Sequence, residues 1–141
     1  MPIGSRFQYK TPEEIEIIRK NCLLVSATLA EVASHIKPGI TGLRLDEIAE
    51  AFIRDHGAEP AFKGYPGSLS DFPASLCISF NEVIVHGIPD KTEVKEGDVV
   101  SVDCGVKMNG YFGDAAFTFA VGQISPEVLD LLVTTRECLD L

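Results

Sequence analysis

The sequence predicts an α+β fold in which antiparallel β-hairpins pack against long helices. Three observations indicate it: a long amphipathic helical pattern near the N-terminus, a series of short apolar β-type runs from residue 75 onward, and an Asn-Gly pair between two of these runs. With 141 residues, 45% of them hydrophobic and 23% charged, the chain can bury one core. This composition excludes disordered and fibrous proteins.

Capping signals define the first two helices. Thr11 is followed by proline and two glutamates, a capping box that predicts a helix start. Apolar residues then recur at helical spacing as far as Ile36, and the Lys-Pro-Gly segment 37–39 ends the pattern. Thr41 is a candidate cap for a second helix, which is predicted to stop at Gly57.

The middle of the chain predicts a loop and then strands. Segment 58–73 is rich in Gly, Pro, Ser and aromatic residues, which is typical of a long ordered loop that carries function. Four runs predict an antiparallel set of strands: residues 75–80, 83–88, 98–106 and 110–119. The first two are separated by Asn81-Glu82 and the last two by Met108-Asn109-Gly110, so each pair predicts a hairpin.

A last helix is predicted to begin at Ser125-Pro126-Glu127. No capping signal follows it before the sequence stops at Leu141. We therefore expect the chain to be cut within a longer domain.

Charge and cysteine usage exclude several classes of protein. The formal net charge of −9 argues against nucleic acid as a partner, because such binding depends on Lys and Arg that neutralise phosphates. No run approaches the roughly 18 apolar residues of a membrane span, and no secretion signal opens the chain, so we expect a cytoplasmic protein without a membrane partner. Four cysteines lack CxxC spacing and are predicted to be buried or pocket-lining thiols: Cys22, Cys77, Cys104 and Cys138.

Two aspartates stand in predicted strands, although aspartate is a poor strand former. Alternation in residues 98–106 places four residues on a core face: Val100, Val102, Cys104 and Val106. Asp103 then lies on the opposite face, and Asp114 lies on the less apolar face of the next strand. If Met108-Asn109 is a two-residue loop, the two carboxylates are directly opposite; a three-residue loop shifts the pairing by one.

Two facing carboxylates repel each other and destabilise a sheet unless something compensates. A divalent cation can compensate, because carboxylates ligate Mg²⁺, Mn²⁺, Zn²⁺, Fe²⁺ and Co²⁺. The alternatives are a pair that shares one proton and two solvent-exposed side chains on an edge hairpin. Small residues beside the pair favour close approach by a ligand.

Among the three histidines, His86 is the candidate for a site. His35 and His56 fall at the ends of predicted helices, where the helix dipole favours histidine. His86 ends an apolar run and precedes Gly87, so it is a candidate hydrogen-bond partner for a substrate. A histidine packed within its strand is the alternative.

Three segments together resemble type I methionine aminopeptidases of the bacterial kind: PAFKGYPG, NEVIVHGIPD and GDVVSVDCGVKMNGYFGDAAFTFAVG. The resemblance runs from about residue 10 to residue 141. The related prolidases and aminopeptidases P share the aspartate hairpin but not the block around His86.

This resemblance implies half of a pita-bread fold and a hydrolase that removes the initiator methionine from nascent proteins. It implies two divalent metal ions, Co, Mn, Fe or Zn, with Asp103 binding one ion through both oxygens and Asp114 bridging the two. His86 is the implied catalytic residue that holds the substrate near its scissile amide. Tyr65, with Phe62 and Cys77, is the implied lining of the methionine pocket, although Phe62 and Cys77 also fit ordinary core packing.

The same resemblance implies that residues 1–141 form the N-terminal half of the catalytic domain, with residues 1–10 as an extension and the C-terminal half absent. The other metal ligands of the family, a histidine and two glutamates, have no counterpart here. We therefore expect weak or no metal binding and little activity from this chain alone. The alternatives are a non-catalytic binding module and a half-fold that self-associates through its uncovered face. The loop over 64–73 is longer than in some relatives.

Overall fold

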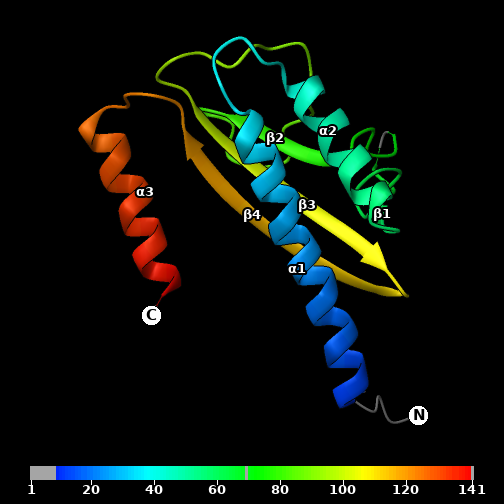
Figure 1. Cartoon of the computed structure of the whole chain (residues 1–141). Coiled ribbons are helices and arrows are strands. Elements are labelled where there is room, and N and C mark those ends of the chain that lie inside the picture. The colour runs from blue at the N-terminus through cyan, green and yellow to red at the C-terminus, as the bar shows by residue number, and fades with distance from the viewer. Residues whose placement is uncertain (1–8, 69, 141) are drawn as a thin grey trace.

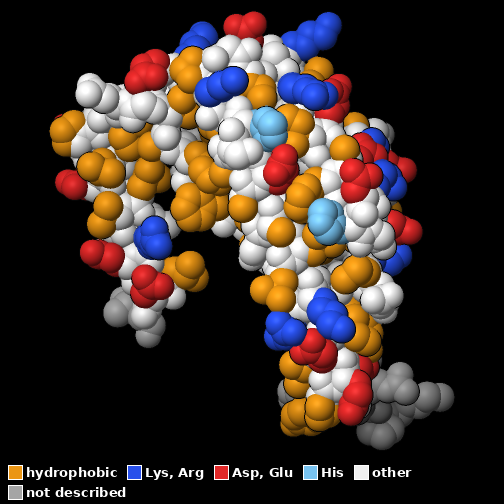
Figure 2. Space-filling model, in the orientation of Figure 1, with side chains coloured by type: hydrophobic (Ala, Val, Ile, Leu, Met, Phe, Trp, Pro, Cys, Tyr) orange, Lys and Arg blue, Asp and Glu red, His pale blue; other side chains and the backbone are white. Residues whose placement is uncertain are grey.

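The computed structural model describes residues 9–68 and 70–140 of the chain. These residues contain three helices: α1 (Pro12–His35), α2 (Gly42–Asp55) and α3 (Pro126–Leu139). They also contain four strands: β1 (Glu59–Pro60), β2 (Leu76–Phe80), β3 (Val99–Met108) and β4 (Tyr111–Ala120). Helices α1 and α2 cover one face of the sheet, whereas α3 stands apart and buries no residue (Figure 1). Figure 2 shows hydrophobic side chains exposed along α3.

The predicted helix starts are confirmed. At α1 the Thr11 hydroxyl accepts a hydrogen bond from the Glu14 amide, and the Glu14 carboxylate accepts one from the Thr11 amide at 2.7 Å. Thr41 caps α2 and Ser125 caps α3 in the same way: each hydroxyl accepts a hydrogen bond from the backbone amide three residues later. The expected extension over residues 1–10 lies mostly outside the described residues. No described helix is long and apolar enough to cross a membrane.

Strand β3 is the centre of an antiparallel sheet. One edge pairs with β4 along its whole length, from Val99 opposite Ala120 to Met108 opposite Tyr111. The other edge pairs first with β2 and then with the short β1. The predicted loop over 58–73 therefore begins with a strand that the sequence did not indicate, because two residues are too few to show alternation.

The first predicted hairpin is wrong. Residues 83–88 form no strand, and two backbone hydrogen bonds join them to β2: the Ile78 amide donates to the Gly87 carbonyl, and the Val83 amide donates to the Phe80 carbonyl. Asn81 adopts a φ of 50° and its side chain bonds to Asp98 and Val99, which turns the chain away from β2. His86 has a φ of 58°, and a residue in this region interrupts an extended strand.

The second predicted hairpin exists, but its turn consists of Asn109 and Gly110, with φ values of 55° and 80°. Both residues of a type I′ turn need positive φ, which Asn-Gly supplies best. The predicted opposition of the two aspartates is therefore wrong by two positions. Asp103 pairs with Ala116, and Asp114 pairs with Gly105.

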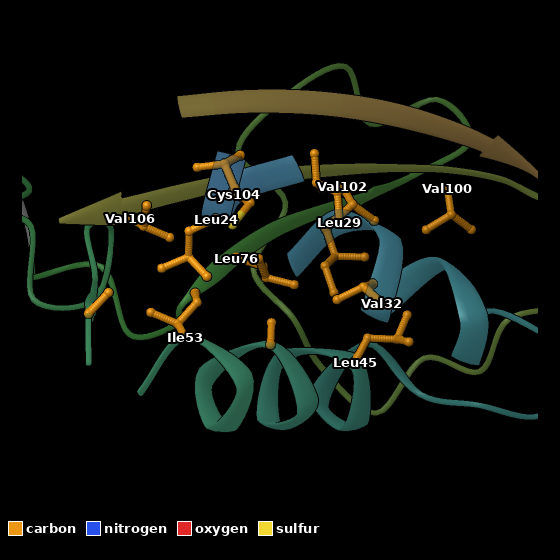
Figure 3. Packing of buried hydrophobic residues seen from close by; sticks show 14 of the residues in the cluster. Leu24, Leu29, Val32, Leu45, Ile53, Leu76, Val100, Val102, Cys104 and Val106 are labelled. Atoms are coloured by element: carbon orange, nitrogen blue, oxygen red, sulfur yellow. The ribbon is translucent and has the colours of Figure 1, made fainter. Parts of the chain in front are cut away.

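The core lies between the sheet and helices α1 and α2 (Figure 3). All four residues of the predicted core face of β3 have an exposed fraction of 0%: Val100, Val102, Cys104 and Val106. The same cluster includes Leu29 and Val32 of α1, Leu45 and Ile53 of α2, and Leu76 of β2. Burying each such side chain contributes roughly 1.5–3 kcal/mol. This burial fixes which face of the sheet remains for other contacts.

A close contact joins α1 to β4 at Gly113. A side chain there would place its Cβ 2.7 Å from the backbone carbon of Asn21 and 2.8 Å from the amide nitrogen of Cys22. The Asn21 side chain also donates to the Met108 carbonyl at 3.2 Å. Helix and hairpin therefore approach as closely as a glycine permits.

We expect Gly113→Ala to lower the free energy of unfolding by about 1–3 kcal/mol, because the added methyl group overpacks this contact. Urea unfolding followed by circular dichroism measures the change. Phe112→Ala is the control, since Phe112 is 57% exposed on the opposite face, and it should cost less. An unchanged midpoint for Gly113→Ala would show that α1 and β4 are not in close contact.

Candidate functional site

A cavity of about 530 Å³ opens on the face of the sheet opposite the core. It contains all six residues that the sequence analysis predicted for a site: Phe62, Tyr65, Cys77, His86, Asp103 and Asp114. Four separate parts of the chain supply them: the loop after β1, strand β2, the segment after β2, and the β3–β4 hairpin. The structure thus brings the six together, while their individual roles stay predictions.

The hairpin holds the two aspartates on one face. Asp103 pairs with Ala116 and Asp114 with Gly105, so the carboxylates are diagonal neighbours. Such neighbours lie about 7–8 Å apart at Cα, within reach of one small ion or bridging group. Cys77 pairs with Asp103 on the other edge of β3 and shares its face. The two-position shift in register therefore preserves the predicted proximity.

Asp103 has an unfavourable environment for its charge. Burial raises the pKa of Asp103, and repulsion from Asp114 raises it further. Nearby His86 and the backbone amide of Cys104 partly oppose this rise in pKa. One oxygen of Asp103, Oδ1, is buried and has no hydrogen-bond partner among the described residues. A buried carboxylate oxygen without a partner, beside a second carboxylate, fits a bound cation.

The buried thiols are unsuited to nucleophilic chemistry. Burial, followed by repulsion from Asp103 and Asp114, raises the pKa of Cys77 to about 11 and that of Cys104 to about 12. Both thiols are therefore protonated at neutral pH, and the thiol is a poor nucleophile. Cys77 acts as a small apolar part of the cavity wall. The prediction of buried or pocket-lining thiols is wrong for Cys22 and Cys138, which lie on exposed helix surfaces.

His86 stands at the cavity on an irregular segment that strand β2 holds in place. The next residue, Gly87, accepts from the Ile78 amide at 2.8 Å and donates to the Ser79 hydroxyl at 3.1 Å. A Cβ at Gly87 would lie 2.1 Å from the Ile78 carbonyl oxygen, so only glycine fits. The two other histidines end helices as predicted, His35 in α1 and His56 at the cap of α2.

The loop after β1 forms the apolar wall of the cavity. Phe62 lies directly over Gly105, where a Cβ would come 2.6 Å from its ring. Gly64 donates to the Phe72 carbonyl, and Phe72 donates to the Tyr65 carbonyl, which closes the loop. Tyr65 is 68% exposed at the rim.

Sequence reasoning did not assign several lining residues, among them Asp71, Phe72 and Ile88. The unusual length of the loop was a general signal for Asp71 and Phe72, and Ile88 belongs to the same block as His86. Leu69, inside the loop, lies outside the described residues.

Comparison with models of protein families identifies the family of this chain. The model of metallopeptidase family M24 matches residues 16–141. The chain belongs to family M24. The predicted α+β half of a pita-bread fold is thereby confirmed, since solved M24 aminopeptidases superpose on nearly all of the chain.

Similar M24 proteins are methionine aminopeptidases. Methionine aminopeptidase 1 of Bacillus subtilis is 49% identical over 130 residues, which are 92% of this chain and 51% of that protein. The crystal structure of the Thermotoga maritima enzyme has a TM-score of 0.88 at 40% identity and covers 94% of this chain and 52% of its own. The Rickettsia prowazekii enzyme has a TM-score of 0.87 at 32% identity, covering 92% and 51%. The chain spans about half the length of these relatives.

Membership of M24 implies use of divalent metal. Asp103 and Asp114 fit part of such a site, because they supply oxygen donors and the unpartnered Oδ1 atom. The residues that the structure describes contain no group of three or more His, Cys, Asp or Glu side chains placed to hold an ion. Two carboxylates alone are an incomplete ligand set.

We expect Asp103→Asn to stabilise the fold at pH 7. The folded pKa of Asp103 is raised above its ordinary 3.8, so the buried charge costs stability once the pH exceeds that value. The stabilisation should grow as the pH rises through the folded pKa and vanish below about pH 3, where the carboxyl is neutral in both states. Urea midpoints at both pH values measure it. Equal midpoints at pH 7 would contradict an unfavourable charge at Asp103.

Proposed function

We propose that this chain carries part of the active site of a metal-dependent aminopeptidase that removes the N-terminal methionine of nascent proteins. The single observation that carries the proposal is one cavity that combines two adjacent carboxylates with an apolar wall and a histidine. The similar proteins from Bacillus subtilis, Clostridium perfringens and Thermotoga maritima are named methionine aminopeptidases, which supports it.

The apolar wall is suited to an unbranched thioether side chain. Phe62, Phe72, Ile88 and the protonated thiol of Cys77 line it, and Tyr65 stands at its rim. Aromatic rings and sulfur make favourable contacts with methionine sulfur, and the cavity admits a side chain of that size. In this proposal these residues bind and orient the methionine.

The charge of the cavity favours a cationic group. The described lining residues include three aspartates, Asp71, Asp103 and Asp114, and no lysine or arginine. A cavity lined by one sign of charge attracts the opposite sign, here metal cations and the α-ammonium group of a peptide. The cavity therefore prefers the N-terminal end of a substrate peptide, which carries both the methionine and the α-ammonium group.

We assign the polar residues as follows. Asp103 and Asp114 would hold two divalent ions, Co, Mn, Fe or Zn, which when bound supply an activated water and polarise the scissile carbonyl. His86 lines the cavity beside Gly87, which strand β2 holds by hydrogen bonds, and in this proposal its ring orients the scissile amide by a hydrogen bond. Removal of initiator methionine takes place in the cytoplasm, so we propose a cytoplasmic location.

We further propose that this chain by itself binds metal weakly and has little peptidase activity, because its described residues supply only two carboxylates to the site. Release of methionine from a Met-Gly-Met peptide in the presence of Mn²⁺ or Co²⁺ is the measurement. Metal-dependent release by the chain alone, abolished by Asp103→Asn, would refute this.

A chimera tests the proposed function directly. Residues 10–141 would replace the matching half of the Thermotoga maritima enzyme, of which they cover about half. We expect metal-dependent release of methionine from Met-Gly-Met. Asp103→Asn should lower kcat/KM by about 100-fold or more, because even residues that merely support a metal ligand are worth 10–100-fold.

Asp55→Asn is the matched control for that chimera, since Asp55 is an exposed carboxylate at the end of α2. It should leave kcat/KM unchanged. A folded chimera that binds metal but releases no methionine would contradict the proposed function.

A non-catalytic binding module is not favoured, because the cavity keeps both carboxylates and His86 and the similar proteins are named as aminopeptidases.

Self-association is a separate proposal, for which a groove of about 360 Å³ between α1 and β4 gives a surface. Leu29, Ala33, Ala115, Phe117 and Phe119 are among its lining residues. Phe117 is 48% exposed there. Apolar surface of this kind favours contact with a second copy.

Multi-angle light scattering measures the proposed association. We expect a dimer that Phe117→Ser weakens by about tenfold or more, since a buried aromatic contact is worth at least 1.4 kcal/mol. Phe112→Ser is the control, because Phe112 is similarly exposed on the opposite face. A purely monomeric chain would exclude this surface as an interface.

A further inference from the structure

A buried carboxylate outside the cavity holds one of its strands. Asp46 lies in α2 with only 8% of its surface exposed, although its side chain is a carboxyl group. Its Oδ1 atom accepts two backbone hydrogen bonds, from the Ser75 amide at 2.9 Å and from the Leu76 amide at 2.8 Å. Burial raises the pKa of Asp46, and the two amides oppose that rise. Burial of a carboxyl group costs stability unless it is hydrogen-bonded, and these two backbone contacts are the hydrogen bonds that Asp46 makes.

The two amides lie where the chain enters the cavity wall. Leu76 is the first residue of β2, and the next residue, Cys77, lines the cavity and pairs with Asp103. Before Ser75 the chain belongs to the loop that forms the apolar wall. The Asp46 carboxylate therefore fixes the point at which loop and strand meet.

Strand β2 transmits this position to the other side of the cavity. Its Ser79 hydroxyl accepts from the Gly87 amide, and its Ile78 amide donates to the Gly87 carbonyl, so it holds the segment of His86. The strand has only five residues, and β3 is the one described strand with which it pairs. A displacement of its first residue moves both Cys77 and the anchor of His86.

We propose that Asp46 is a positioning residue of the cavity, which sets Cys77 and His86 in place by holding the start of β2. The inference rests on the proposed function for what the cavity binds. The contact between Asp46 and the start of β2 does not depend on it. The position requires a side chain that accepts hydrogen bonds from both the Ser75 and the Leu76 amides. Aspartate meets this need from helix α2, and asparagine, with the same Oδ1, meets it without charge.

Four variants separate a positioning role of Asp46 from an effect on overall stability. Asp46→Ala removes the acceptor, Asp46→Asn keeps it, and Glu47→Ala changes the neighbouring exposed carboxylate that pairs with Arg44. Val32→Ala is a fourth, matched for destabilisation, since Val32 is fully buried in α1 away from the cavity lining. Thermal unfolding confirms that each variant is folded at the temperature of the assays.

Amide exchange and thiol alkylation test the contact without any activity. We expect Asp46→Ala to speed exchange of the Ser75 and Leu76 amides and alkylation of Cys77 by iodoacetamide about tenfold or more, since buried donors lose their partner. Asp46→Asn should stay within about threefold of the original chain. Peptide mass mapping separates Cys77 from the exposed Cys22 and Cys138.

Methionine binding, followed by NMR titration, tests the consequence for the cavity. We expect Asp46→Ala to weaken it about tenfold, with recovery in Asp46→Asn and no change in Glu47→Ala or Val32→Ala. Equal weakening by Val32→Ala, or unchanged exchange and alkylation in Asp46→Ala, overturns the inference. If methionine fails to bind the original chain, the cavity of this chain alone is not a methionine site; exchange and alkylation still decide the role of Asp46, and the chimera decides the proposed function. Asp46→Ser, whose hydroxyl is too short to bridge both amides, replaces an Asp46→Ala variant that does not fold.

Discussion

The alternation of side chains along β3 is the constraint on which core and cavity both depend. Strand β3 hydrogen-bonds to β4 on one edge and to β1 and β2 on the other, so each of its faces is shared with the rest of the sheet. Its even-numbered residues from Val100 to Val106 are fully buried under α1 and α2. Burial of that face leaves only the opposite one for Asp103, because a slip of one residue would exchange the two sets.

The cavity face keeps groups that stability alone would not select. Asp103 carries a raised pKa and an unpartnered oxygen beside Asp114, and His86 holds a left-handed backbone. Strained backbone and perturbed carboxylates gather at functional sites, where the surrounding structure compensates for them. Here the compensation comes from the valine face of β3 and from the two hydrogen bonds that join Gly87 to β2.

Local signals predicted much of the fold and some of the site. The helix caps, the core face of β3 and the common face of the two aspartates each depend on residues close together in sequence. The exact register did not follow, because the prediction weighed a two-residue loop at Met108-Asn109 against a three-residue loop, whereas the positive φ values of Asn109 and Gly110 make these two residues the turn. The false hairpin at residues 83–88 had the composition of a strand, but the positive φ values of Asn81 and His86 interrupt an extended strand there.

The sequence by itself determined the class of fold, the candidate ligands Asp103 and Asp114, and a resemblance that the M24 match confirms. These depend on periodicity and on motif residues, which are properties of short segments. Only the tertiary structure decided that Phe62, Cys77 and His86 meet those aspartates in one cavity, and that α2 holds the strand between them. Such contacts join residues far apart in the sequence, 30 positions for Asp46 and Leu76, and their geometry depends on packing that no local pattern records.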